Sequence, residues 1–341
     1  MASVVELYSR QMSSALTSLA ETPESQTVSA AGDSFLALPA TVGAVQVVNQ
    51  VPIFWNWAPT APGIMDLSLF TFCDTIPLSN VDGAPFFSGT ASFSSNYRSF
   101  VSTISSAGAF ASIAADAAQR IIEPLPSAST PPGWARVAVN NILEWRPVWS
   151  PQLSPSQWMA GVVGSNPTSR TIEFDLSGAA PSSASAPEGP WPSLLPLLGS
   201  SARNISITAK AWGRIPIVPG DWFSTALVTV AAQSDVFQPW TSSMLFGAQG
   251  LLRYRISEFF AAYSPELSMT VGGDVSAAVT SFLATAKNFV FGGMAFSGGA
   301  ASVPRTLQPE VTVADTGTTI TGKAASPYPQ IVAVIVSAPD A

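Results

Sequence analysis

Histidine is absent from this 341-residue chain, and only 10% of its residues are charged. A soluble domain ordinarily carries about 25% Asp, Glu, Lys and Arg. Histidine is the commonest general acid or base near neutral pH and a frequent metal ligand, so its absence removes much hydrolytic and metal chemistry. The composition therefore predicts a protein that is not an enzyme and that uses no metal or other cofactor.

Basic residues are also scarce, with three lysines, eleven arginines and a net charge of −7. Because no basic arm is present, strong binding to nucleic acid or to an anionic membrane is not expected. Arg253 and Arg255 would share one face of a strand, and we interpret them as a solvated or ion-paired edge. With a hydrophobic fraction of 47%, so little charge predicts that other chains cover much of the surface.

Cysteine occurs once, at Cys73, which excludes a disulfide within the chain. The apolar run over 67–73 predicts that this thiol is buried and unreactive. No run reaches the roughly 18 apolar residues of a membrane-spanning helix, so no transmembrane segment is expected.

Apolar residues at helical spacing predict helices over 4–20, 107–123 and 274–290. Asp274 is the expected N-cap of the last helix, between turn and cap glycines at 272–273 and 292–293. The first helix has one apolar stripe, which predicts that it docks onto a larger body. The stripe consists of Val4, Val5, Tyr8, Met12, Leu16 and Leu19.

Most of the remaining chain consists of short segments typical of β-strands, separated by turns rich in Pro and Gly. This pattern predicts a mainly β fold: a jelly-roll-like antiparallel β-sandwich with two or three helical insertions and long loops rich in Pro, Ser and Ala. The expected strands lie within 42–57, 65–72, 88–104, 135–139, 171–176, 205–211, 215–221, 226–231, 251–260, 267–271, 310–313 and 330–336.

Two parts are expected: an N-terminal helix and extended arm over 1–40, and a β-rich main domain over 41–341. The main domain would divide near 177–203, a low-complexity segment rich in proline. Trp191 and the leucines at 194–198 are too apolar to remain in water. This segment is therefore expected to pack against the rest of the protein.

Three acidic residues raise the question of a site. Glu173 and Asp175 would share one side of a strand, and paired carboxylates can hydrolyse glycosides without histidine. The same alternation, with Ile172 and Phe174 inward, is also typical of an ordinary half-exposed strand. Asp221 precedes two aromatic residues, as acids in sugar-binding sites do. The sequence assigns no catalytic residue and leaves open whether these acids form a site.

The composition, the short strands between Pro-rich loops, and the segments 215–223, 226–231 and 250–256 together resemble a known class of protein. They are similar to strand and loop segments of jelly-roll coat proteins from small non-enveloped icosahedral viruses. The resemblance extends over about residues 40–340 but includes no diagnostic motif, so no functional residue is carried over.

This resemblance implies a structural subunit that self-assembles into a viral capsid or a similar symmetric shell. Its partners would be copies of itself, with or without other coat subunits, and it would assemble in the host cytoplasm and reside in the virion. Many such families carry a basic N-terminal arm, which this chain lacks. Contact with nucleic acid would then be weak or indirect, with the genome charge neutralised by ions or another subunit.

Two alternatives remain open at this point. A pore-forming or membrane-active β-rich protein could use the amphipathic, Ser/Thr-rich stretch over 88–104. A histidine-free carbohydrate-binding protein could use Glu173, Asp175 or Asp221.

Overall fold

The described part of the computed structural model is mainly β, as expected, with antiparallel and mixed sheets accompanied by helices. The expected strands over 42–72, residue Trp191 and the glycines at 292–293 lie outside the described residues. The described residues are 4–20, 35–37, 73–77, 87–104, 110–124, 129–139, 142–164, 169–180, 194–247, 250–286, 288–291, 294–297, 307–314, 317–324 and 329–337.

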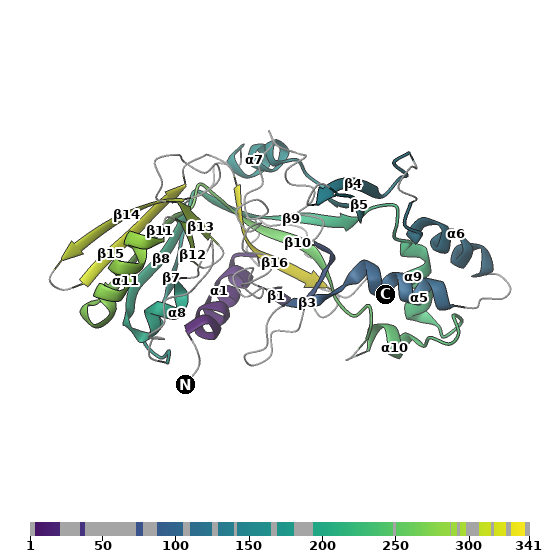
Figure 1. Ribbon diagram of the computed structural model, residues 1–341, viewed down its shortest axis with the longest axis horizontal. Helices are drawn as coiled ribbons and strands as arrows, with labels where there is room; N and C mark the ends of the chain where they lie inside the picture. Colours follow the sequence, from purple (N-terminus) through teal and green to yellow (C-terminus); the bar gives the residue numbers. More distant parts are fainter. Residues whose placement is uncertain are drawn as a thin grey trace.

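Two large sheets form the framework of the molecule (Figure 1). The five-stranded sheet has the order β1 (Phe35–Ala37), β16 (Pro329–Ser337), β10 (Arg255–Tyr263), β9 (Ala211–Pro219) and β6 (Trp149–Pro151). The seven-stranded sheet has the order β12 (Asn288–Phe291), β13 (Met294–Ser297), β14 (Leu307–Ala314), β15 (Gly317–Ala324), β11 (Glu266–Gly272), β8 (Ala202–Ala209) and β7 (Arg170–Phe174). Two small sheets pair β2 (Thr75–Pro77) with β3 (Phe87–Ser92), and β4 (Trp134–Val139) with β5 (Ile142–Pro147).

Two bent strand pairs connect the large sheets. Strand β8 continues into β9 with only Lys210 between them, and β10 continues into β11 through Ser264 and Pro265. Ser264 has a positive φ of 49°, and the Lys210 N–H donates to the Tyr263 carbonyl at 3.0 Å. The ladder between the two pairs thus continues through the bend, and the strands leave one sheet to enter the other.

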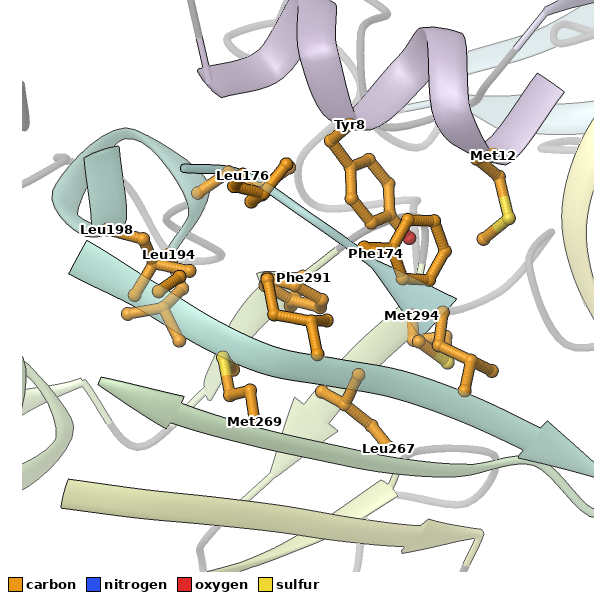
Figure 2. Close-up of a cluster of buried hydrophobic side chains, with 14 of the residues drawn as sticks. Tyr8, Met12, Phe174, Leu176, Leu194, Leu198, Leu267, Met269, Phe291 and Met294 are labelled. Carbon is orange, nitrogen blue, oxygen red and sulfur yellow. The ribbon is translucent and has the colours of Figure 1, made fainter. Parts of the chain in front are cut away.

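A hydrophobic core lies between the two sheets, and we call it the inter-sheet core. It includes Phe260 from the five-stranded sheet and Leu267 and Met269 from the seven-stranded sheet. Three helices close it: α1 (Val4–Ala20), α8 (Leu195–Leu198) and α11 (Gly273–Thr285). Figure 2 shows Tyr8 and Met12 of α1 pointing toward the sheet, where Tyr8 stacks on Phe174 with ring centroids 4.8 Å apart.

The first expected helix is confirmed, and so is the burial of four residues of its docking stripe. Val4, Tyr8, Met12 and Leu16 are buried in the inter-sheet core, spaced four residues apart on one side of α1. The prediction that the leucines at 194–198 pack inside is also confirmed, because Leu194, Leu195, Leu197 and Leu198 are all buried there.

The five-stranded sheet is covered on both faces. Along β10, Phe259 and Ala261 face a second core, whereas Phe260 and Ala262 face the inter-sheet core. On β16 the pairing shifts by one residue at a bulge, since Phe260 pairs with Ala333 and Ala261 pairs with Ile331. Such a bulge turns two successive side chains to one side, and Val332 and Ala333 both lie in the inter-sheet core.

The second core, which we call the aromatic core, lies on the other face of this sheet and is closed by helices, most of which gather at one end of the molecule (Figure 1). These helices are α5 (Phe93–Thr103), α6 (Ala111–Ile121), α7 (Pro155–Gly164), α9 (Thr225–Gln233) and α10 (Ser242–Phe246). Phe93, Tyr97, Trp149, Trp222 and Phe223 form a continuous set of ring contacts with centroids 4.9–6.5 Å apart. Edge-to-face arrangements predominate, as ring quadrupoles favour.

The expected strand over 88–104 is wrong for most of its length, because β3 ends at Ser92 and α5 follows. The buried residues of this segment are Phe93, Tyr97, Phe100 and Val101. Their spacing is that of one face of a helix and not the alternation of a strand. The Ser92 side chain caps the helix by accepting from the Ser95 N–H at 3.0 Å. Burial of this aromatic stripe outweighs the low helix propensity of Ser and Thr.

The expected strand over 226–231 is also wrong, since these residues lie in α9. Ser224 caps this helix by accepting from the Leu227 N–H, and Leu227, Val228 and Ala231 are buried. The helix expected over 274–290 is shorter than expected: α11 begins at Gly273 with Gly272 as N-cap, ends at Thr285, and is followed by β12. The described residues therefore contain more helices than the two or three expected.

Candidate assembly surface

Strand β14 lies between β13 and β15 in the seven-stranded sheet, at the end of the molecule farthest from α6 (Figure 1), and most of its side toward β13 is open among the described residues. It pairs with β15 in a regular register from Leu307↔Ala324 to Ala314↔Gly317. On its other side, it meets β13 through the single pair Leu307↔Phe296. From Gln308 to Ala314, no strand among the described residues pairs with this side, so its backbone groups form an open edge.

Two features define which backbone groups face outward. Only two residues separate Ala314 from Gly317, so this pair closes a hairpin as a hydrogen-bonded pair. The N–H and C=O groups of Ala314, Thr312 and Glu310 then point toward β15. Pro309 agrees with this assignment, because a residue without an N–H fits a strand where its nitrogen faces the open side. By the same alternation, Val311 and Val313 direct their N–H and C=O groups outward.

The side chains of these two valines are exposed, by 38% for Val311 and 61% for Val313. They lie opposite Ile320 and Thr318 of β15, which are both buried. Directly opposed residues of antiparallel strands share a sheet face, so both valines lie on the inner face of the sheet but beyond the cover of α11. A shallow groove beside them is lined by Ala277, Ser281 and Ala284 of α11 and by Val313 and Ala314.

Hydroxyl groups hold α11 against the sheet. The buried Thr318 hydroxyl forms a hydrogen bond with the Ser276 hydroxyl and a second, longer one with Thr280 Oγ1 at 3.4 Å. Val279 and Phe282 on the same helix reach into the inter-sheet core. The helix is therefore fixed over β11 and β15, and no described helix packs over β14.

The outer face of this sheet is polar. On β11, Ser268 and Thr270 alternate with the buried Leu267 and Met269, and the other strands continue this pattern. This is the usual arrangement for an antiparallel sheet with one wet face. Its polar residues include Thr171, Glu173, Ser206, Thr208, Glu266, Ser268, Thr270, Gln308, Glu310, Thr312, Thr319, Thr321 and Lys323.

The three acidic residues singled out in the sequence do not come together. Glu173 is exposed on the outer face of β7, opposite Ser206, and Asp175 is exposed just beyond that strand. Hydrogen bonds from the side chain and the backbone N–H of Ser177 lower the pKa of Asp175. Asp221 is exposed in the turn after β9, which belongs to the other sheet. The half-exposed strand with Ile172 and Phe174 inward is confirmed.

The two arginines of the expected basic edge also differ from the prediction. Strand β10 begins at Arg255, and Arg253 lies in the preceding turn, where its guanidinium is 4.5 Å from the Tyr254 ring centroid. They therefore do not alternate along one strand.

Cys73 is fully buried in the aromatic core, as predicted. Burial raises the pKa of its thiol, and the neighbouring Asp74 carboxylate raises it further. Because the thiolate is the reactive form, this thiol is poorly suited to nucleophilic chemistry.

Asp74 is a buried acid with a structural contact. Its two carboxylate oxygens accept from the Ser94 N–H at 2.7 Å and from the Ser94 hydroxyl at 2.6 Å. Ser94 lies in the first turn of α5, where N–H groups lack partners within the helix. Burial raises the pKa of Asp74, while the bonds from Ser94 and Ser92 and the charge of Arg146 oppose this rise. The residue serves as a second cap of α5.

Arg214 and Glu258 form an ion pair on adjacent strands β9 and β10. Arg214 Nη2 donates to Glu258 Oε1 at 2.5 Å, and Nε lies 2.5 Å from Oε2. Their side chains are only 16% and 21% exposed. Burial raises the pKa of Glu258, and the Arg214 charge and hydrogen bond counteract it.

Among the described residues, no group of three or more metal-ligating side chains is placed to bind an ion. None of the described helices combines the length and the hydropathy needed to cross a membrane. No protein-family model, curated protein or solved structure matches the chain.

The open side of β14 does not follow from the expectations drawn from the sequence. The residues 310–313 were expected to form a strand, which is confirmed, but not an edge strand. Pro309 was the available signal, because proline inside an alternating segment favours the edge of a sheet over its centre.

Proposed function

We propose that this chain is a structural subunit that self-assembles into a symmetric shell, most concretely a viral capsid. Within this proposal, the two sheets around the inter-sheet core form the jelly-roll-like body of the subunit. The partners are copies of the same chain, alone or with other coat subunits, and the protein assembles in the host cytoplasm and resides in the virion.

The observation that carries the proposal is the open edge of β14. A long, regular edge strand with outward backbone groups and two exposed valines is a template for pairing with another chain, and stable monomers usually block such edges. Here the edge strand carries one acid, Glu310, and no lysine. The low fraction of charged residues, 10%, supports the same proposal. With so few charges, repulsion between copies protects little of the surface from association.

The alternative of a membrane-active protein rested on the stretch over 88–104 as extended strands, and most of this stretch belongs to α5. The alternative of a sugar-binding site rested on Glu173, Asp175 and Asp221, which lie in separate places. Neither alternative has a specific observation in its favour, so we propose only the assembly function.

The mass of the native particle tests this function. The purified full-length chain is examined by light scattering and by negative-stain microscopy over a range of concentration and ionic strength. The expected result is closed particles many times heavier than the 35.4 kDa chain. A monomer that persists at the highest soluble concentration, under all conditions, would overturn the proposal.

Binding of RNA and DNA by the purified subunit is measured over a range of salt concentrations. With a net charge of −7 and no basic arm, the purified subunit is expected to bind RNA or DNA weakly. The expected dependence of binding on salt is shallow, because few phosphate-bound counterions are released. Tight binding with a steep salt dependence would contradict the proposed indirect contact with a genome.

A further inference from the structure

We propose that β14 pairs with the β14 of a second copy, antiparallel and centred on Thr312, across a two-fold axis. The inference rests on the proposed function and names one of the contacts that would build the assembly. A two-fold contact uses the same surface on both copies, so the strand must be complementary to itself.

The backbone of β14 meets this requirement. Centring the pair on Thr312 sets Val311 opposite Val313 of the second copy, and Val313 opposite Val311. Both residues direct their N–H and C=O groups outward, so each of these two pairs exchanges two N–H···O=C hydrogen bonds. Four backbone hydrogen bonds would then join the copies without a change in the β14–β15 ladder.

The side chains agree with the same register. On the inner face, the valines of the two copies stand side by side, and branched side chains pack well across strands. On the outer face, Thr312 lies opposite Thr312 of the second copy, and Glu310 lies opposite Ala314 of the second copy. The two Glu310 carboxylates are therefore kept apart, which avoids a like-charge pair.

Neighbouring registers fit less well. Centring the contact on Val311 sets Pro309 opposite Val313, and the missing N–H of Pro309 removes one donor from each of two pairs. Centring it on Val313 carries the pairing past Ala314, where β14 ends. The Thr312 register is the one that uses all outward donors of the strand between Pro309 and Ala314.

This contact is small. Five residues from each copy bury far less than the roughly 1,200 Å² of a stable isolated interface. The pairing is therefore expected to act together with other contacts in a multivalent assembly, in which each weak contact is strengthened by the rest.

Single cysteines test the pairing and its register. Thr312→Cys sets two thiols at a non-hydrogen-bonded pair, where Cα atoms lie about 4.5 Å apart, within the range of a disulfide. Mild oxidation of the assembled variant is expected to give a covalent dimer on non-reducing gels. Glu310→Cys alone and Ala314→Cys alone are expected to give none, whereas their equimolar mixture gives a dimer containing one of each. Wild type is the background control, because its Cys73 is fully buried.

A charge variant gives an independent readout. Val311→Lys places ammonium groups beside each other at the contact and is expected to weaken self-association by about tenfold or more. The matched control is Thr171→Lys, an exposed position on β7, which is an edge strand of the same sheet distant from β14. This control is expected to assemble like wild type.

The outcomes separate the two proposals. If wild type forms particles but Thr312→Cys gives no covalent dimer, the β14 contact is overturned and the assembly function stands. A covalent dimer of Glu310→Cys alone would overturn the register. Equal assembly of Val311→Lys and Thr171→Lys would also overturn the contact. If wild type stays monomeric throughout, the proposed function fails first and the contact falls with it.

Discussion

The side-chain amide of Gln11 forms two hydrogen bonds with the backbone of Asp175. Gln11 Nε2 donates to the Asp175 carbonyl at 2.5 Å, and the Asp175 N–H donates to Gln11 Oε1 at 2.8 Å. Strand β7 is the last strand of its sheet and ends at Phe174. The glutamine amide therefore satisfies the backbone N–H and C=O of Asp175, as a neighbouring strand does elsewhere in the sheet. These two bonds also fix α1 along this edge.

Replacing Gln11 with alanine is expected to destabilise the protein by about 1–2 kcal/mol, because two neutral hydrogen bonds are lost. Gln11→Glu is expected to be at least as harmful, since a carboxylate cannot donate to the Asp175 carbonyl. Chemical denaturation followed by tryptophan fluorescence measures both. Ser14→Ala, at an exposed position of the same helix, serves as the control and is expected to change little; an equal loss in this control would contradict the role of the amide pair.

Asp74→Ala is expected to cost about 2–3 kcal/mol, because the Ser94 N–H and hydroxyl lose their buried acceptors. Asp74→Asn keeps one acceptor oxygen and should cost less at neutral pH. Unfolding free energies from denaturant titrations test this order. If the asparagine and alanine variants were equally unstable, the cap would not be the reason for the loss.

The same residue predicts a pH dependence. Burial raises the pKa of Asp74 in the folded chain, so the folded state holds this proton more tightly than the unfolded state does. Its contribution to stability is full below about pH 4, the ordinary Asp value, and is lost as pH rises through the raised pKa. Relative to wild type, Asp74→Asn should therefore gain stability from pH 4 upward and level off at higher pH. A constant difference across this window would contradict the raised pKa.

We expect the net attraction between Arg214 and Glu258 to contribute little to the free energy of unfolding. Each partner is important because it prevents the other from being left as an unpaired, partly buried charge. Arg214→Met or Glu258→Gln alone is expected to cost about 2–3 kcal/mol, because one partly buried charge stays behind. The double variant should recover most of that loss. A double-mutant cycle from thermal or denaturant unfolding measures the coupling. Additive losses would show that the two side chains act independently.

Gly133→Ala is expected to be strongly destabilising. Gly133 has a φ of 81°, and an added Cβ would lie 2.4 Å from the Trp222 backbone nitrogen. The strained φ and the backbone clash together are expected to cost about 3 kcal/mol or more. Gly161→Ala in α7, where an added Cβ meets nothing within 4 Å, should instead stabilise by about 0.5–1 kcal/mol. Similar melting temperatures for the two variants would contradict this difference.

Local patterns predicted much of the secondary structure. The stripe of Tyr8, Met12 and Leu16 predicted α1, and the alternation of Ile205 and Ile207 with Ser206 and Thr208 predicted β8. Helix α5 was missed because its aromatic spacing occurs in a Ser/Thr-rich segment, where composition favours strands and turns. Its caps explain the outcome, and one of them, Asp74, lies 20 residues away from Ser94.

The arrangement of the sheets could not be predicted from such local patterns. The pairing of Phe35 with Val336 joins residues about 300 positions apart, and no periodicity reports such a partner. The same limit applies to the candidate surface. The residues of β14 form a recognisable strand, but whether its second side is paired depends on where the rest of the chain lies.

Strand β16 separates the inter-sheet core from the aromatic core and lies between β1 and β10. All other described elements precede it in the chain. During synthesis on the ribosome, the sheet shared by the two hydrophobic cores therefore lacks this strand until residue 337 has emerged from the exit tunnel. Because the partners of β16 are so distant in sequence, its addition to the sheet is expected to be slow. Until β16 is in place, chaperones would need to protect the exposed apolar faces of β10.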